Sequence, residues 1–286
     1  MRRATFNSPA AAGLSAGVRL VAPAILPEGE VDVWRATLDD VPDDEVAFFT
    51  TILSADEEDR AEEFYLERDR RRFVACRGIL RLLVSDYTGQ PAGDVVLRYG
   101  VHGKPELGGH DAGRLHFNLA HAESLALFAF TRSGPVGIDV ERIRELPDWE
   151  SIVRTCFSEQ DRARVREAAP GARLGEFFRA WTRQEARLKA LGVGIGGRDP
   201  IDPAQPAEPY TDGYNPAFHG VGPRALSLYP LHLGDGYAAA LAADASVRWA
   251  TFLGWNTARP SGGGRAACQR RRMPLGLMAK AGIRFL

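Results

Sequence analysis

Val136-Gly137-Ile138-Asp139-Val140-Glu141 is the stretch from which the rest of the chain is best interpreted. Its residues alternate, and successive side chains of a strand point to opposite faces, so we predict a strand with its branched apolar residues in the core. Asp139 and Glu141 would then share the other face, about 7 Å apart along the strand. Two carboxylates so placed suit a hard, oxygen-seeking cation such as Mg²⁺. An amphipathic strand with a solvated acidic end explains the same pattern, and this stretch alone favours that simpler interpretation.

A second stretch, Trp181-Thr182-Arg183-Gln184-Glu185-Ala186-Arg187-Leu188-Lys189, has helical periodicity. Trp181, Glu185 and Lys189 are spaced four residues apart and fall close to one face of a helix. One interpretation makes Glu185 a general base or metal ligand and Lys189 a phosphate contact. The other is a surface Glu–Lys pair beside a core tryptophan, and the helix taken alone favours it.

Two further segments place polar side chains where strands are expected to end or turn. Phe117-Asn118-Leu119-Ala120-His121 puts Asn118 and His121 at a strand end, where both side chains could donate hydrogen bonds to a phosphate. Gly103-Lys104-Pro105 holds a cation at the tip of a turn, although an ordinary solvated lysine explains it equally well.

The chain around these stretches indicates an α+β fold. Ser54 and Glu57 form a capping-box pattern that starts a long helix over 54–84. Ser133-Gly134-Pro135 predicts a turn that joins its two flanking strands as a hairpin. We expect helices from about Ser158 and over 175–191, an irregular loop over 200–223, and strands over 31–38, 95–99, 115–119, 125–131, 136–140, 225–229, 236–242 and 249–253.

Composition excludes several classes of protein. Residues 1–26 and 259–286 hold ten basic residues and no acid, which leaves 26 basic against 37 acidic residues in 27–258. A nucleic-acid binder would carry its basic surplus on the folded domain, so we expect no nucleic-acid partner. No run of about 18 apolar residues occurs, so we expect no membrane span. Three scattered cysteines argue against a disulfide framework and for a reducing cytoplasm.

The order and spacing of these motifs are more specific than any one of them. G-K-P, F-N-x-x-H, G-I-D-V-E, F-S-x-x-D and W-T-x-x-E-A-x-x-K follow one another between about residues 31 and 255. This series resembles the surfactin-type (Sfp-type) 4′-phosphopantetheinyl transferases. The resemblance implies a monomer folded as two similar α/β subdomains, an intramolecular pseudo-dimer, with coenzyme A bound between them. The halves would be 27–135 and 136–258, after a loose extension over 1–26 and before a basic, disordered tail over 259–286.

The resemblance also implies roles for individual residues. Asp139 and Glu141 match metal ligands, and Glu185 matches a residue both near the metal and acting as general base. Lys189 matches a contact to a phosphate of coenzyme A and takes part in catalysis. Further contacts to coenzyme A are matched by Lys104, Asn118, His121, Arg60 and Arg72.

Several residues depart from the family pattern. Asp161 stands where a third acidic ligand is usually Glu, and it also fits a capping box with Ser158. Ala120 replaces a common Ser, and Gln184 replaces a common Lys, so contacts to coenzyme A are fewer.

The activity that the resemblance implies is that of a holo-[acyl-carrier-protein] synthase. Such an enzyme uses Mg²⁺ to move the 4′-phosphopantetheine arm of coenzyme A to a serine of an apo acyl or peptidyl carrier protein, and releases 3′,5′-ADP. Carriers of fatty-acid, polyketide and nonribosomal peptide biosynthesis all fit. Two alternatives stay open: a magnesium-dependent nucleotide or coenzyme A hydrolase, and a catalytically silent member that only binds carriers. The transferase hypothesis requires the acidic strand and the 185/189 helix to converge.

Overall fold

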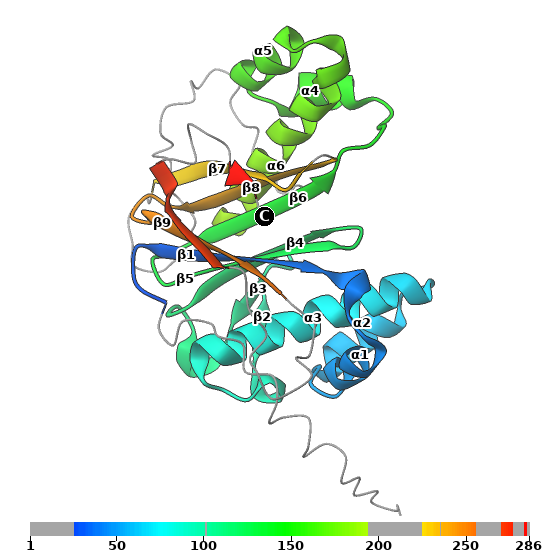
Figure 1. Ribbon diagram of the computed structural model, residues 1–286, viewed down its shortest axis with the longest axis vertical. Coiled ribbons are helices and arrows are strands. Elements are labelled where there is room, and N and C mark those ends of the chain that lie inside the picture. The colour runs from blue at the N-terminus through cyan, green and yellow to red at the C-terminus, as the bar shows by residue number, and fades with distance from the viewer. Residues whose placement is uncertain are drawn as a thin grey trace, which may run out of the picture. The chain divides into compact units, whose positions relative to one another are not determined.

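The computed structural model describes residues 26–100, 102–193, 225–234, 236–255, 270–276 and 283–284. They form a mixed α+β structure, which confirms the expected fold class (Figure 1). The described residues fall into two compact units, one of which is 39–95. We call it the helical unit, and we call the remaining described residues the sheet unit. The expected loop over 200–223 lies outside the described residues, as does the expected extension over 1–26 except for its last residue.

The helical unit shows that the single helix expected over 54–84 was wrong. Two helices replace it, with an extended residue, Leu66, between them. The capping box of Ser54 and Glu57 is confirmed at the start of the first. The elements are α1 (Asp43–Thr50), α2 (Ala55–Glu62), α3 (Glu67–Thr88) and the 3₁₀ turn η2 (Ala92–Asp94), preceded by η1 (Leu38–Asp40).

A buried ion pair explains the break. Glu57 on α2 and Arg81 on α3 are each 1% exposed, and Arg81 Nε donates to Glu57 Oε2 at 2.6 Å. Residues 24 positions apart would be about 36 Å apart along one continuous helix. The chain must therefore turn back between them. Arg81 also donates to the carbonyl oxygens of Ala92 and Val95, so most of its donors are satisfied.

This pair predicts a large stability effect. Arg81→Met leaves the buried carboxylate of Glu57 without its cationic partner. We therefore expect a loss of about 3–5 kcal/mol in the free energy of unfolding. The double variant Glu57→Leu/Arg81→Met should recover most of that loss, because it leaves neither charge buried. Denaturant unfolding measures both values. Arg60→Met, on the exposed Arg60–Glu63 pair of α2, is the control and should change stability by less than about 1 kcal/mol. A loss that small for Arg81→Met would contradict the proposed importance of burial.

The sheet unit contains two main sheets and one small one. The first has the order β10-β9-β1-β5-β4, the second β11-β7-β8-β6, and the third pairs β2 with β3. The strands are β1 (Glu30–Thr37), β2 (Leu97–Tyr99), β3 (Pro105–Leu107), β4 (His116–Ala122), β5 (Leu125–Thr131), β6 (Val136–Arg142), β7 (Leu226–His232), β8 (Tyr237–Asp244), β9 (Trp249–Gly254), β10 (Arg270–Pro274) and β11 (Ile283–Arg284). The other elements are η3 (Gly109–Asp111), α4 (Trp149–Cys156), α5 (Glu159–Glu167), η4 (Pro170–Ala172) and α6 (Arg173–Leu191).

The two main sheets share one apolar core. Val33 of β1, Leu127 of β5, Ile138 of β6 and Leu241 of β8 are all buried in it. The other face of the second sheet is covered by α6, with α4 and α5 packed beyond it (Figure 1). The strand predicted at 136–140 and the helix predicted at 175–191 are thus confirmed and lie against each other. None of the described helices is both long and apolar enough to cross a bilayer.

The hairpin expected across Ser133-Gly134-Pro135 was wrong. β5 pairs with β1 and β4, whereas β6 pairs with β8, so the chain changes sheets at this turn. Both edges of β5 are occupied, by β1 and β4, so β6 cannot pair with β5. The turn is tied back to the first sheet, because Ser133 Oγ accepts the backbone N–H of Gly29 at 2.6 Å.

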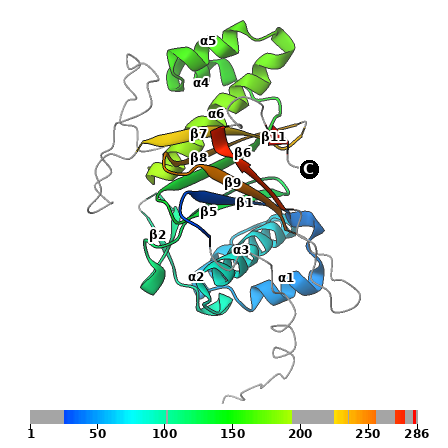
Figure 2. The same ribbon diagram turned by 60° about the vertical axis from the view of Figure 1, so that its left-hand side comes forward.

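Part of the tail expected to be disordered is a strand. Arg270–Pro274 forms β10, which pairs antiparallel with β9 (Figure 2). Arg272 pairs with Glu30 at 2.6 Å and lies over the ring of Trp249 at 4.3 Å. Charged side chains are well tolerated on an edge strand, which is why a run of arginines does not prevent pairing here.

Candidate functional site

The site is organised by the close approach of α6 to β6. Gly137 lies where the helix crosses the strand, and a Cβ added there would collide with the backbone of Ala186 and Ala190. Four alanines of α6 and β8, Ala186, Ala190, Ala240 and Ala242, line the same contact. Small residues on both sides let the backbones meet, and this brings the acidic face of β6 to the helix. Gly192, in the left-handed conformation with φ of 71°, ends α6 directly after residue 191, where the expected helix over 175–191 stops.

Asp139 and Lys189 meet at this contact. Asp139 is 4% exposed, and Lys189 Nζ donates to its Oδ1 at 2.7 Å. Among the described residues, no hydrogen-bond partner reaches Oδ2, which is also buried. Burial raises the pKa of Asp139, and the ammonium of Lys189 opposes that rise. The convergence of the acidic strand with the 185/189 helix, which the transferase hypothesis required, is therefore present.

Two more carboxylates belong to this cluster. Burial, followed by the charge of Asp139, raises the pKa of Glu141, whose carboxylate accepts the indole N–H of Trp181. Burial and the nearby Asp139 raise the pKa of Glu185 to about 7. Glu185 is 7% exposed on α6, one turn before Lys189. A carboxyl group with this pKa can take up and release a proton near neutral pH, as a general base must.

The donor set suits a hard cation. It offers carboxylate oxygens from Asp139, Glu141 and Glu185, mutual repulsion that a cation would relieve, and the unbonded Oδ2 of Asp139. Among the described residues, no three His, Cys, Asp or Glu side chains lie close enough together to hold a metal ion. The residue types therefore suit Mg²⁺, although their side chains are not gathered around one point in the described residues.

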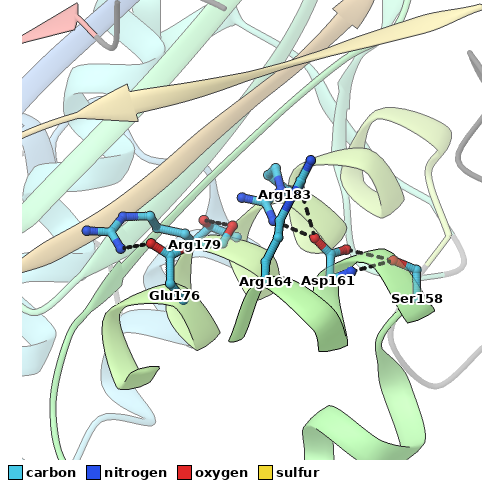
Figure 3. Close-up of polar contacts among 7 residues, drawn as sticks. Ser158, Asp161, Arg164, Glu176, Arg179 and Arg183 are labelled. Atoms are coloured by element: carbon cyan, nitrogen blue, oxygen red, sulfur yellow. Dashed lines mark hydrogen bonds and ion pairs between the residues drawn. The ribbon is translucent and has the colours of Figure 1, made fainter. Parts of the chain in front are cut away.

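Asp161, the expected third acid, has its carboxylate bound elsewhere. Its Oδ1 accepts Arg183 Nη2 at 2.5 Å and Arg164 Nη1 at 3.4 Å, and its Oδ2 accepts Ser158 Oγ at 3.0 Å (Figure 3). Its backbone N–H donates to Ser158 Oγ, so Ser158 caps the start of α5 and one of the two hydrogen bonds of the expected capping box is present. No pattern in the sequence pointed to Arg183.

Asn118 and Lys104 both bind the backbone of β6. The backbone N–H of Ile138 donates to Asn118 Oδ1 at 2.8 Å, and Lys104 Nζ donates to the carbonyl oxygen of Val136 at 3.2 Å. Burial lowers the pKa of Lys104 to about 8. These side chains join the edge strand β4 and the β2–β3 turn to β6, a structural role that the sequence did not reveal. His121 lies exposed on β4.

The two arginines expected to meet the nucleotide lie in the helical unit. Arg60 on α2 pairs with Glu63, and Arg72 on α3 makes two hydrogen bonds to Asp39, of 2.7 and 2.6 Å. Both are therefore engaged with acids of their own unit.

The role of Gly137 was also missed. A glycine inside a strand weakens it and commonly marks a close approach of another backbone. That signal was available in the sequence, because Gly137 lies among β-branched residues.

Comparison with known proteins gives a consistent result over most of the chain. The family model described as the 4′-phosphopantetheinyl transferase superfamily matches residues 135–242. The model described as the N-terminal part of 4′-phosphopantetheinyl transferase matches residues 39–132.

Individual relatives have the same kind of name. The chain is 40% identical to 4′-phosphopantetheinyl transferase HetI of Nostoc sp. over 182 residues, which is 63% of this chain and 76% of HetI. It is 29% identical over 155 residues to a phosphopantetheinyl transferase of Thraustochytrium sp., with 50% and 54% of the two chains covered. It is 26% identical over 153 residues to the human L-aminoadipate-semialdehyde dehydrogenase-phosphopantetheinyl transferase, with half of each chain covered.

Proposed function

The chain belongs to the 4′-phosphopantetheinyl transferase superfamily, and from this premise we propose how its site performs the transfer. The arm of coenzyme A moves to a serine of an apo acyl or peptidyl carrier protein, and 3′,5′-ADP is released. The observation that carries the assignment of the site is the meeting of Asp139, Glu185 and Lys189 where α6 crosses β6.

A magnesium ion would be held by Asp139 and Glu141, with Glu185 beside them. When bound, it supplies charge neutralisation for the pyrophosphate, which in phosphoryl transfer is commonly the largest catalytic contribution. Lys189 contributes a cation to the same place: its side chain is 32% exposed and can turn from Asp139 toward a phosphate.

Glu185 is the proton acceptor in this proposal. The oxygen of the carrier serine attacks the β-phosphorus of coenzyme A, and its proton passes to the carboxylate of Glu185. The bond between the β-phosphorus and the oxygen that bridges to the nucleotide phosphate breaks, and that oxygen leaves as part of 3′,5′-ADP.

We also propose the arrangement in two similar halves, 27–135 and 136–258, in a monomer. Two observations support a boundary near Pro135: one family model ends at residue 132 and the other begins at residue 135, and the chain changes sheets at the same place. Location in the cytoplasm stays a prediction from the scattered cysteines, of which the buried Cys76 is a free thiol.

Mass spectrometry of apo-carriers tests the reaction class. Incubation with the protein, coenzyme A and Mg²⁺ should add the mass of the phosphopantetheine arm to the carrier serine. Release of products from coenzyme A without a carrier would instead identify a hydrolase. Carrier binding in calorimetry without any turnover of coenzyme A would identify a silent member.

Replacement of Glu185 separates proton transfer from binding. We expect Glu185→Gln to lower turnover about 10²- to 10⁴-fold at saturating Mg²⁺, because the amide cannot accept the serine proton. The dissociation constant for coenzyme A should change much less. Steady-state kinetics and calorimetry measure the two effects. Glu176→Gln is the matched control, since Glu176 lies on the same helix but pairs with Arg179. An unchanged turnover for Glu185→Gln would remove Glu185 as the base.

A further inference from the structure

Strand β6 is the last strand of its sheet, and β4 is the last strand of the other main sheet. The two strands lie side by side where the sheets meet, yet among the described residues β6 pairs only with β8 (Figure 1). In an antiparallel pair, alternate residues direct their N–H and C=O groups away from the neighbouring strand. The outer edge of β6 therefore has backbone groups without ladder partners, and burying such groups unsatisfied is costly.

Side chains from outside the sheet bind these groups of β6. The N–H of Ile138 donates to Asn118 Oδ1 at 2.8 Å, and the carbonyl oxygen of Val136 accepts Lys104 Nζ at 3.2 Å. Val136 and Ile138 are two residues apart, so their backbone groups face the same edge of the strand. Asn118 is 3% exposed and Ile138 is 0% exposed, so the first of these bonds is buried. The outer edge of β6 is thus held by two side chains in place of a neighbouring strand.

Asn118 lies on the face of β4 that packs into the shared apolar core. Ala120 and Ala122, at alternate positions of the same strand, are buried in that core. A polar side chain is stable there only if it is hydrogen-bonded. Because a backbone N–H needs an acceptor, the amide oxygen of Asn118 is the atom that faces Ile138. That oxygen is occupied by β6, and it could not bind a phosphate, which needs donors.

The hold on β6 ends directly before Asp139. Ile138 precedes this acid, and Gly137 lies against the backbone of α6. The position of the strand at this contact sets the position of the carboxylate that Lys189 binds at 2.7 Å. A shift of the strand edge by about 1 Å would lengthen this pair and move Asp139 relative to Glu185. Displacements of that size can cost about a hundredfold in rate.

We propose that Asn118 is a positioning residue, which holds the edge of β6 through its hydrogen bond to Ile138 and so places Asp139 against α6. Asn118 then acts on the transfer through β6, in contrast to the contact with coenzyme A that the resemblance implied. The effect on transfer rests on the proposed function, whereas the hold on β6 does not. Lys104 adds a second tie to the same edge, two residues earlier.

Asn118→Leu tests the proposal, because leucine has a similar size but no hydrogen-bond acceptor. At saturating Mg²⁺ and coenzyme A, and at a temperature where the variant is folded, we expect turnover to fall about 10- to 100-fold. The dissociation constant for coenzyme A, measured by calorimetry, should stay within about threefold of the wild type. Weaker binding of coenzyme A with turnover retained would make Asn118 a direct contact and overturn the proposal. Asn118→Ala loses the same acceptor and serves if Asn118→Leu folds poorly.

Thr131→Val is the matched control. Thr131 is 0% exposed, and its hydroxyl donates to the carbonyl oxygen of Glu30 at 2.7 Å. It too joins two strands through a hydrogen bond from a buried side chain to the backbone, but within the first sheet. We expect a lower melting temperature with turnover within about threefold of the wild type. Equal losses of turnover in Thr131→Val and Asn118→Leu would indicate general destabilisation and overturn the positioning role.

Amide hydrogen exchange tests the hold on β6 without any assay of transfer. In Asn118→Leu the amide of Ile138 should exchange at least about tenfold faster, relative to the amides of β8, because its acceptor is gone. Protection of Ile138 as in the wild type would show that Asn118 does not hold the strand. If the wild-type protein loads no carrier, the proposed function fails, while exchange at Ile138 still decides whether Asn118 holds β6.

Discussion

Asp139→Ala is expected to lower the transfer of phosphopantetheine at least about a hundredfold to a thousandfold. Three observations converge on this side chain: its burial, its ion pair with Lys189, and its effect on the pKa of Glu185. Removing it takes away the central oxygen donor of the proposed metal site. It also frees Lys189 and lowers the pKa of Glu185, which would then be a weaker base. The measurement is the rate of carrier loading at saturating Mg²⁺ and coenzyme A.

The same replacement should leave the fold intact. Burial raises the pKa of Asp139, which means that the folded protein destabilises the ionised form of this carboxylate. Lys189 is 32% exposed and can reach solvent after its partner is removed. The replacement therefore leaves no unpaired charge fully buried. We expect a melting temperature close to that of the wild type. This combination separates a functional acid from a structural one.

Asp244→Asn provides the matched comparison. Asp244 is 7% exposed at the end of β8, in the same sheet, and its carboxylate accepts the N–H and hydroxyl of Ser246. It is a buried acid with a local structural task, and we expect its replacement to change the transfer rate by less than about threefold while lowering stability. Near-normal carrier loading by Asp139→Ala would remove Asp139 from the site.

The sequence predicted the elements that carry the site because their periodicities are strong. Alternation over 136–140 and helical spacing over 175–191 come from local patterns, and both elements were confirmed. The pairing of strands was harder to predict from the sequence. The turn at Ser133-Gly134-Pro135 has the residues of a hairpin, but these residues fix only a change of chain direction. Because both edges of β5 are occupied by β1 and β4, β6 pairs elsewhere.

Residues with two plausible roles were not resolved by sequence. Asp161 fitted both a ligand and a cap, and no pattern in the sequence indicated that Arg183, 22 residues later, would bind its carboxylate. Asn118 and Lys104 matched contacts to coenzyme A, while the structure gives each a backbone partner on β6. The break between α2 and α3 depended likewise on a contact between distant residues, Glu57 and Arg81. Long-range contacts of this kind leave no periodic trace.

Gly137 is the residue through which fold and site depend most directly on each other. It is the glycine of the motif that carries Asp139, two residues away on β6. A methyl group at this position would fall on the carbonyl oxygen of Ala186 and the backbone nitrogen of Ala190. Side chains could rotate away from such a clash, but backbone atoms in the middle of a helix cannot. Accommodation requires α6 to move off the sheet.

Gly137→Ala is therefore expected to damage stability and catalysis together. Forcing extra volume into a closely packed contact costs about 1–3 kcal/mol, and more where the backbone must shift. A displacement of α6 by about 1 Å would lengthen the 2.7 Å Asp139–Lys189 pair and misplace Glu185, at a cost of about a hundredfold in rate. Thermal unfolding and carrier loading on the same preparation measure the two effects. Gly254→Ala is the control, because Gly254 is likewise a strand residue, at the end of β9, but has nothing within 4 Å of an added Cβ. A Gly137→Ala protein with wild-type melting and wild-type transfer would show that the approach of α6 to β6 does not hold the site together.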